Sequence, residues 1–316
     1  MIGLSAVYLL AGAVFGAIAI LSALDRANPK RWANALFWGL FAASFLAGDY
    51  LGDLGNGVLV LAMVAIAGVV GLGLGRPATT DQDQRRDLAR RHGNRLFLAA
   101  LAIPAVTLIG ALSFRTIAID GVPLFDPAQT TLVAFAVSVL VALALARVML
   151  RQTLPVALQE GRRLLDLLGW AALLPQMLAA LGAVFALAGL GTAVGDLVAH
   201  AIPTDNRLAV VVAYTFGMAL FTVIMGNAFA AFPVMTAGIG LPLIVMTFGG
   251  DPVIMSAIGM LSGFCGTLMT PMAANFNVVP VALLGLQDRY AVIKAQLPTA
   301  ITLLIVNTVL MYIFVF

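Results

Sequence analysis

Two short polar sequences interrupt the most apolar part of this chain. Both lie in a stretch with a single charged residue, and they read Gly226-Asn227-Ala228 and Thr270-Pro271-Met272-Ala273-Ala274-Asn275-Phe276-Asn277. An apolar stretch of this length is typical of a protein that spans a bilayer. Irregular backbone at membrane depth is tolerated only where protein or a water-filled cavity surrounds it. These residues are therefore the first candidates for a binding site.

The first sequence predicts that one helix ends and another begins close to Asn227. Glycine frees the backbone, and the asparagine amide offers one acceptor oxygen and two donor hydrogens. The helix that restarts has unpaired N–H groups and a partial positive charge, which suit a carboxylate. The helix that ends offers carbonyl oxygens, which suit Na⁺.

The second sequence combines a helix breaker with polar side chains. Pro271 removes a donor and clashes with the preceding turn. A simple alternative is a proline kink whose amides pair with neighbouring helices. Two such breaks in the least charged part of the chain favour a substrate or ion site instead. Its candidate residues are Gly226, Asn227, Ala228, Thr270, Pro271, Ala274, Asn275 and Asn277.

The composition predicts an all-α polytopic membrane protein. Hydrophobic residues make up 62% of 316 positions and charged residues 10%, whereas a soluble domain has roughly 25% charged residues. One cysteine and two histidines exclude an internal disulfide and make a Cys/His metal site implausible. A buried proton relay needs acidic groups or histidine, and none lies at membrane depth in 208–286, which favours Na⁺. No HExxH sequence or Ser/His/Asp set indicates an enzyme.

Hydropathy divides the chain into about nine to ten membrane segments. The predicted spans are 2–24, 33–48, 57–75, 96–113, 130–149, 167–189, a broken region of 207–248 and 253–286, and 295–316. All of the basic residues except Arg115 and Arg207 fall in or directly before alternate loops, at 25–32, 76–95, 150–166 and 287–294, with Arg147 just before the third. Such loops remain on the cytoplasmic side, so we expect a periplasmic amino terminus and a loop at 190–206 on that side too.

This orientation requires an odd number of crossings between 207 and 286. Segment 207–248 can be a re-entrant hairpin with its tip near Asn227, followed by one crossing at 253–286 that is interrupted near Thr270-Pro271. Two full crossings in 207–248 satisfy the charges equally well. The amphipathic segment 151–166 is expected along the cytoplasmic interface, either as a linker or as an arm that joins two domains.

The carboxy-terminal half resembles the ion transporter superfamily. The resemblance is carried by the run from Trp170 to Leu190 and by MGNAFAAFPVM and GTLMTPMAANFNVVP. Na⁺/dicarboxylate members have a Ser-Asn-Thr hairpin tip and a broken helix with a Thr-Pro-Pro-Asn-like stretch. Gly226-Asn227-Ala228 matches the tip, and Thr270-Pro271 with Asn275 matches the break. Glycine and alanine replace the serine and threonine of the tip, so two side-chain oxygens are missing.

The whole chain is more similar to a bacterial family of about this length, the large subunits of a two-component 5-oxoproline (pyroglutamate) transporter. Segment 226–300 carries this resemblance most specifically. It implies a smaller membrane subunit as partner, an inner-membrane location and an elevator motion. Superfamily members have two inverted halves, whereas this chain shows one tip and one break. A partner that supplies the second half would explain the difference.

The resemblance also implies roles for the two halves of the chain. Residues 1–166 would be mainly scaffold, and 167–316 would be the transport domain with hairpin 207–248 and broken helix 253–286. The carboxylate of 5-oxoproline would meet the helix N-termini after Asn227 and Asn275. Asn275, Asn277 and Thr270 would orient the lactam or the ion, and Asn227 and Asn275 are the candidates for contact with Na⁺. The alternatives are another organic anion, such as a dicarboxylate, and a membrane subunit that assembles a partner without transporting.

Overall fold

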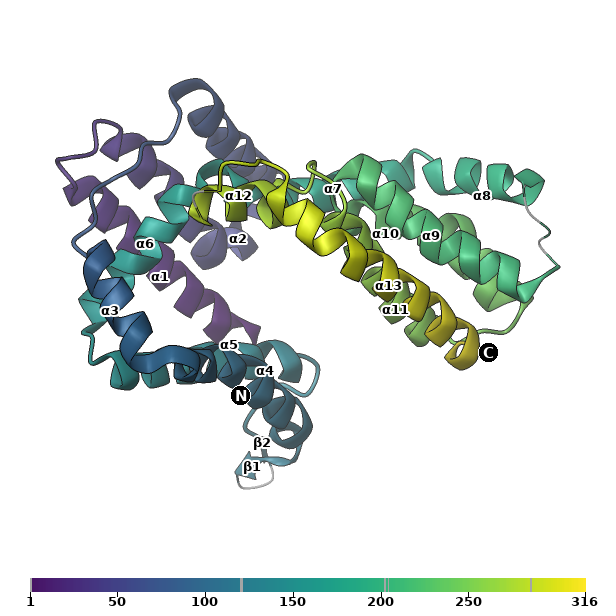
Figure 1. Ribbon diagram of the computed structural model, residues 1–316, viewed down its shortest axis with the longest axis horizontal. Helices are drawn as coiled ribbons and strands as arrows, with labels where there is room; N and C mark the ends of the chain where they lie inside the picture. Colours follow the sequence, from purple (N-terminus) through teal and green to yellow (C-terminus); the bar gives the residue numbers. More distant parts are fainter. Residues whose placement is uncertain (1, 120–121, 202, 204, 285) are drawn as a thin grey trace. The chain divides into compact units, whose positions relative to one another are not determined.

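The chain forms two compact helical units, Met1–Trp170 and Ala171–Phe316, in a computed structural model (Figure 1). The structure describes residues 2–119, 122–201, 203, 205–284 and 286–316. Among the described residues, β1 (Ala118–Ile119) and β2 (Val122–Pro123) are strands of two residues each, and they pair antiparallel. The division after residue 170 lies close to the expected one after 166, and the scaffold and transport roles of the units remain predictions.

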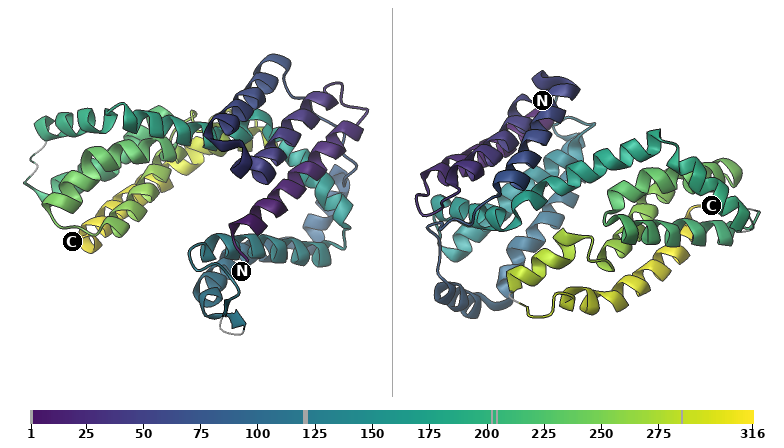
Figure 2. Two further views of the ribbon diagram at one scale, coloured as in Figure 1. Left: turned by 180° about the vertical axis from the view of Figure 1, so that it is seen from behind. Right: turned by 90° about the horizontal axis from the view of Figure 1, so that it is seen from above.

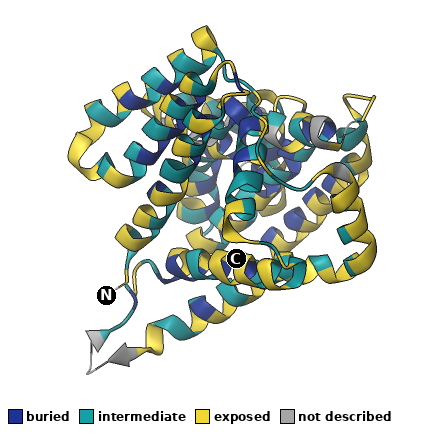
Figure 3. Ribbon diagram, turned by 90° about the vertical axis from the view of Figure 1, so that its left-hand side faces the viewer, coloured by how far each residue is buried: buried dark blue, intermediate teal, exposed yellow. Residues whose placement is uncertain are grey.

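The protein is a multi-pass membrane protein. Eight helices in the described part of the chain are long and apolar enough to cross a membrane: Leu4–Leu24, Arg31–Val70, Asp83–Thr116, Thr130–Leu150, Leu154–Phe185, Arg207–Met225, Ala228–Thr247 and Ala291–Phe314. Exposed positions recur along the helices (Figure 3), and many carry large apolar side chains such as Leu61 and Leu108. Surfaces of this kind suit contact with lipid. The predicted all-α polytopic fold class is confirmed.

In the first unit the helices are α1 (Leu4–Leu24), α2 (Arg31–Ala65), α3 (Gln82–His92), α4 (Phe97–Ser113), α5 (Thr130–Leu150) and α6 (Leu154–Leu168). Short stretches of tighter or wider helix flank them: η1 (Ile66–Val70), η2 (Gly93–Leu96) and η3 (Phe114–Thr116). A further one, η4 (Gly169–Leu173), includes the boundary between the two units. α1 packs along α2, and α4 packs along α5.

The long helix α2 folds back on itself at Gly52, which has φ 59° and ψ −177°. The Lys30 Nζ before the helix donates to the Val70 carbonyl beyond it at 2.8 Å. A straight helix of 35 residues would separate those ends by roughly 50 Å. The reversal therefore makes two antiparallel arms, in agreement with the separate spans predicted at 33–48 and 57–75.

A buried group of charged side chains fastens α6 within the first unit. The Arg162 guanidinium is 2% exposed, pairs with Asp25 and Asp166, and donates to the Leu21 carbonyl at 2.9 Å. Asp166 Oδ1 accepts from Asn34 Nδ2 at 3.0 Å and from Trp38 Nε1 at 3.3 Å. The positive charge of Arg162 thus holds α6 against the α1–α2 connection, rather than facing solvent.

The Asp25 carboxylate lies in that connection, between the helices. Burial alone would raise its pKa, but the Arg76 and Ala27 N–H groups and the Arg162 charge outweigh burial and hold the pKa below 3.8. A lowered pKa stabilises the fold at pH values above the ordinary pKa, and this contribution is lost as the pH falls through the lowered value.

The second unit contains α7 (Leu174–Leu187), α8 (Leu190–Ala201), α9 (Arg207–Met225), α10 (Ala228–Met235), α11 (Pro252–Leu268), α12 (Ala274–Leu284) and α13 (Ala291–Phe314). α10 continues without a gap into the π-helix η5 (Thr236–Thr247). α9, α11 and α13 lie side by side around a buried apolar core (Figures 1 and 2) that includes Tyr214, Met218, Ile239, Met255 and Met311.

The loop expected at 190–206 is wrong over most of its length, because α8 occupies Leu190–Ala201. α8 lies against η5, and the helices approach closely through glycines. A Cβ on Gly195 would lie 2.6 Å from the Gly238 carbonyl oxygen, and one on Gly191 would lie 3.2 Å from the Val234 oxygen. Small residues four positions apart permit such close packing, and hydropathy alone does not register it.

Replacing Arg162 with methionine should lower the free energy of unfolding by about 3–5 kcal/mol, because Asp25 and Asp166 would be left buried without their cation. Denaturant unfolding in detergent at neutral pH measures the loss. Arg163→Ala is the matched control on the same helix. Its partner Glu160 lies at 2.6 Å but is partly exposed, so we expect a loss of about 0–1 kcal/mol. Equal losses would contradict a specific role of Arg162.

Candidate functional site

The first break separates α9 from α10 by two residues. Gly226 ends α9 in a left-handed conformation, with φ 79° and ψ 1°, and its N–H donates to the Thr222 carbonyl at 2.7 Å. Asn227 is extended, and its Oδ1 accepts from the Phe229 N–H at 2.7 Å. The Asn227 side chain therefore caps the new helix and satisfies one of its unpaired N–H groups.

The second break separates α11 from α12 over residues 269–273. Asn277 is fully buried, and its Nδ2 donates to the Thr267 carbonyl at 2.8 Å and to the Thr270 carbonyl at 2.7 Å. Carbonyls at the end of a helix lack partners within it. Asn277 supplies those partners, so these two oxygens are already engaged and are less available to a cation.

The two breaks contact each other. Thr270 Oγ1 donates to the Val223 carbonyl in the last turn of α9 at 2.9 Å. Gly226 lies directly against Met272, because a Cβ on Gly226 would be 2.8 Å from the Met272 carbonyl oxygen. Positions far apart in sequence thus form one buried cluster, in which Asn227 is 7%, Thr270 2% and Asn277 0% exposed.

Glycines of α11 allow this close approach. A Cβ on Gly263 would lie 2.9 Å from the Ala228 Cβ, and one on Gly266 would overlap the Ala219 carbonyl oxygen. α11 therefore packs against the end of α9 and the beginning of α10 almost backbone to backbone. The fold positions the tip by contact with a second helix, not by the turn alone.

The remaining predicted site residues differ in their surroundings. Ala228 is buried as the first residue of α10, Ala274 is half-buried as the first residue of α12, and Pro271 is exposed. The backbone of Asn275 belongs to α12, but its side chain lies outside what the structure describes. Its predicted contact with substrate therefore stays a prediction.

Two buried oxygens at the breaks have no hydrogen-bond partner among the described residues, Thr222 Oγ1 and Asn277 Oδ1. Thr222 was missed by sequence reasoning, although a hydroxyl one turn before a glycine in an apolar helix is a detectable signal. The cluster also has a donor without a partner among these residues, Asn227 Nδ2, since only its Oδ1 is hydrogen-bonded. Amide and hydroxyl oxygens can bind a hard cation, and an amide N–H can bind a carboxylate.

Comparison with known proteins gives a family for the chain. The family model described as "Protein of unknown function (DUF979)" matches residues 5–316. The chain belongs to the DUF979 family.

Two further comparisons complete the description of this DUF979 member. No curated protein matches the chain. One solved structure, the YdaH transporter of Alcanivorax borkumensis, described as having an unusual topology, is similar over 97% of this chain and 73% of that chain, with 17% sequence identity and a TM-score of 0.36.

The contact between Gly226 and Met272 gives a testable prediction. Gly226→Ala places a side chain in a left-handed conformation, which costs about 1–2 kcal/mol, and also forces it against a carbonyl. Gly249→Ala is the matched control, because Gly249 has φ 71° and nothing within 4 Å of its added Cβ. Gly226→Ala should lose about 1–3 kcal/mol more than the control in denaturant unfolding. Equal losses would show that the approach to Met272 is not tight.

The Thr270 hydroxyl gives a second prediction for the site. Thr270→Val keeps the shape but leaves the Val223 carbonyl and the Met272 N–H unpaired, which should lower the free energy of unfolding by about 1–3 kcal/mol. Thr270→Ser retains the hydroxyl and should retain most of the stability. If valine and serine behave alike, the hydrogen bond between the two breaks contributes nothing.

Proposed function

We propose that this DUF979 protein is one subunit of a secondary active transporter for 5-oxoproline, coupled to Na⁺ and working by an elevator motion. The observation that carries the proposal is the contact between two interrupted helices within one unit of a membrane protein. Broken helices that place free backbone ends together are how many secondary transporters bind substrate and ion. The proposed role is transport, not catalysis.

The charge of the site favours a monocarboxylate. Each helix N-terminus carries a partial charge of roughly +0.5, and α10 and α12 both begin at the breaks. Together they offset about one negative charge. Asp251 is the only formal charge between residues 208 and 286, so no lysine or arginine there can bind a second carboxylate. The lactam N–H and C=O of 5-oxoproline match the Asn277 Oδ1 acceptor and the Asn227 Nδ2 donor, whereas the Thr270 hydroxyl and the Asn277 Nδ2 group are engaged by the backbone.

Na⁺ is the proposed coupling ion because the site provides neutral oxygens. Thr222 Oγ1 and Asn277 Oδ1 are buried and lack partners among the described residues. A buried oxygen without a donor is costly, and a cation would relieve that cost. Across the described residues no three His, Cys, Asp or Glu side chains gather.

We assign the proposed scaffold and transport roles to the two halves of the chain. Residues 1–166 act as scaffold, and 167–316, with the breaks at 226–227 and 269–273, act as the transport domain. A smaller membrane subunit supplies the second half that superfamily members carry in one chain. The protein lies in the bacterial inner membrane with its amino terminus in the periplasm, as the basic loops require.

Uptake of labelled 5-oxoproline into proteoliposomes tests the proposal. The chain is reconstituted alone and with the smaller subunit, each with and without an inward Na⁺ gradient. We expect uptake that needs both subunits and is accelerated by the gradient. Uptake of a dicarboxylate in place of 5-oxoproline would contradict the substrate, and uptake indifferent to Na⁺ would contradict the coupling ion.

Variants at the breaks separate transport from assembly. Asn227→Ala and Asn275→Ala should abolish uptake while the complex with the smaller subunit still forms on size-exclusion chromatography. Asn206→Ala is the matched control. Asn206 caps α9 in the same way, since its Oδ1 accepts from the Leu208 N–H at 2.9 Å, but it lies at the other end of α9 from the first break. Full uptake in both break variants would support an assembly subunit instead.

A further inference from the structure

The first unit contains cavities of its own. An open cavity of about 500 Å³ is lined by residues of α3, the end of α5 and α6. It adjoins a smaller cavity of about 430 Å³, since Thr79, Thr80, Leu88, Gln152 and Val156 line both. The two cavities are neighbours, and the proposed transport function uses neither of them.

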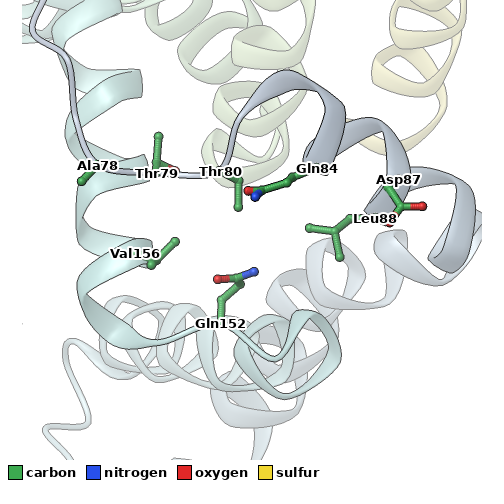
Figure 4. A pocket seen from close by; sticks show the side chains of 8 residues that line it. All are labelled: Ala78, Thr79, Thr80, Gln84, Asp87, Leu88, Gln152 and Val156. Carbon is green, nitrogen blue, oxygen red and sulfur yellow. The ribbon is translucent and has the colours of Figure 1, made fainter.

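The two cavities, the larger and the smaller part of this region, differ in chemistry. The walls of the larger part are mainly apolar and include Leu96, Leu143, Leu150 and Leu164. In the smaller part, the Gln84 amide from α3 and the Gln152 amide before α6 point into the cavity from opposite edges, and Thr80 lies beside Gln84 (Figure 4). A ligand of the larger part needs an apolar body, and its polar end can lie near Gln152, which lines both parts and the adjoining hollow at Arg147 and Arg151.

The polar end of the ligand should be negative. Arg85 and Arg147 line the larger part, and Arg151 lies beside Arg147 at an adjoining hollow. Each cavity has one acidic residue in its lining, and both are already paired. Asp87 of the smaller one lies 2.5 Å from Arg91. Glu160 of the larger one lies 3.1 Å from Arg85 and 2.6 Å from Arg163. Within the described residues neither Arg147 nor Arg151 has an ion-pair partner. Two guanidinium groups therefore remain for an anion.

We propose that this cavity binds one anionic phospholipid. Its phosphate lies between Arg147 and Arg151, with the Gln152 amide as a further donor, and an acyl chain runs along Leu143, Leu150 and Leu164. A small anion would leave the apolar walls uncovered, and a zwitterionic lipid would bring a phosphate whose charge its own ammonium group offsets. The basic segments 76–95 and 150–166 place the site at the cytoplasmic leaflet, whose surface is rich in anionic lipids.

Native mass spectrometry of the purified full-length protein tests the site, with phosphatidylglycerol and phosphatidylcholine of the same chain length as probes. We expect one phosphatidylglycerol to bind more tightly than phosphatidylcholine. Each basic residue near an anionic lipid surface contributes about fivefold in affinity, so Arg147→Gln with Arg151→Gln should weaken phosphatidylglycerol binding about 25-fold. Arg115→Gln, which removes one exposed charge beyond the far end of α4, is the control and should change little.

A second variant tests the apolar part without changing charge. Ala157→Phe narrows the larger cavity, which Ala157 lines, and should also weaken phosphatidylglycerol binding. Glycerol 3-phosphate added as competitor should not displace the lipid. The proposal is overturned if Arg147→Gln with Arg151→Gln and Ala157→Phe both bind phosphatidylglycerol with wild-type affinity. It is overturned as well if glycerol 3-phosphate displaces the lipid. It is also overturned if a photoreactive residue at position 152 crosslinks to protein instead of lipid.

Discussion

The need to hydrogen-bond every backbone polar group away from water governs the second unit. A helix that ends inside an apolar bundle exposes carbonyls and N–H groups that cost several kcal/mol each in hydrocarbon. Here the carbonyls of Thr267 and Thr270 accept hydrogen bonds from the Asn277 amide. The Val223 carbonyl accepts from the Thr270 hydroxyl, and Asn227 caps α10. The polar residues of the two breaks are thus first of all partners for the backbone they interrupt.

This constraint explains how much of the site was predictable. Glycine followed by asparagine, and threonine followed by proline, mark helix ends in an apolar sequence, so the positions of both breaks follow from residue types alone. That the breaks contact each other depends on the packing of α9 on α11 through Gly263 and Gly266, which no local pattern reports. Thr222 was missed for the same reason, because its importance comes from lacking a partner among the described residues.

The first unit shows a similar balance. Alternating charged loops and apolar spans predicted its crossings, including the reversal of α2 near Gly52. The same counting treated Arg162 as one more basic loop residue, whereas it is buried between two carboxylates. Charge patterns record the sign of a residue but not its partner. α8 was likewise missed, because hydropathy and charge left 190–206 as a loop and neither reports the close packing of its glycines against Gly238.

The hydrogen bond from Thr270 to Val223 and the contact of Gly226 with Met272 lie within a single compact unit. The groups proposed to hold a ligand would therefore keep their spacing whenever that unit is displaced as a rigid body. Affinity measured from either side of the membrane should then be nearly the same. In the proposed elevator motion, the energy barrier would then come from removing water from the surface of the moving unit. The hydrogen bonds of the binding site around the substrate would not need to break.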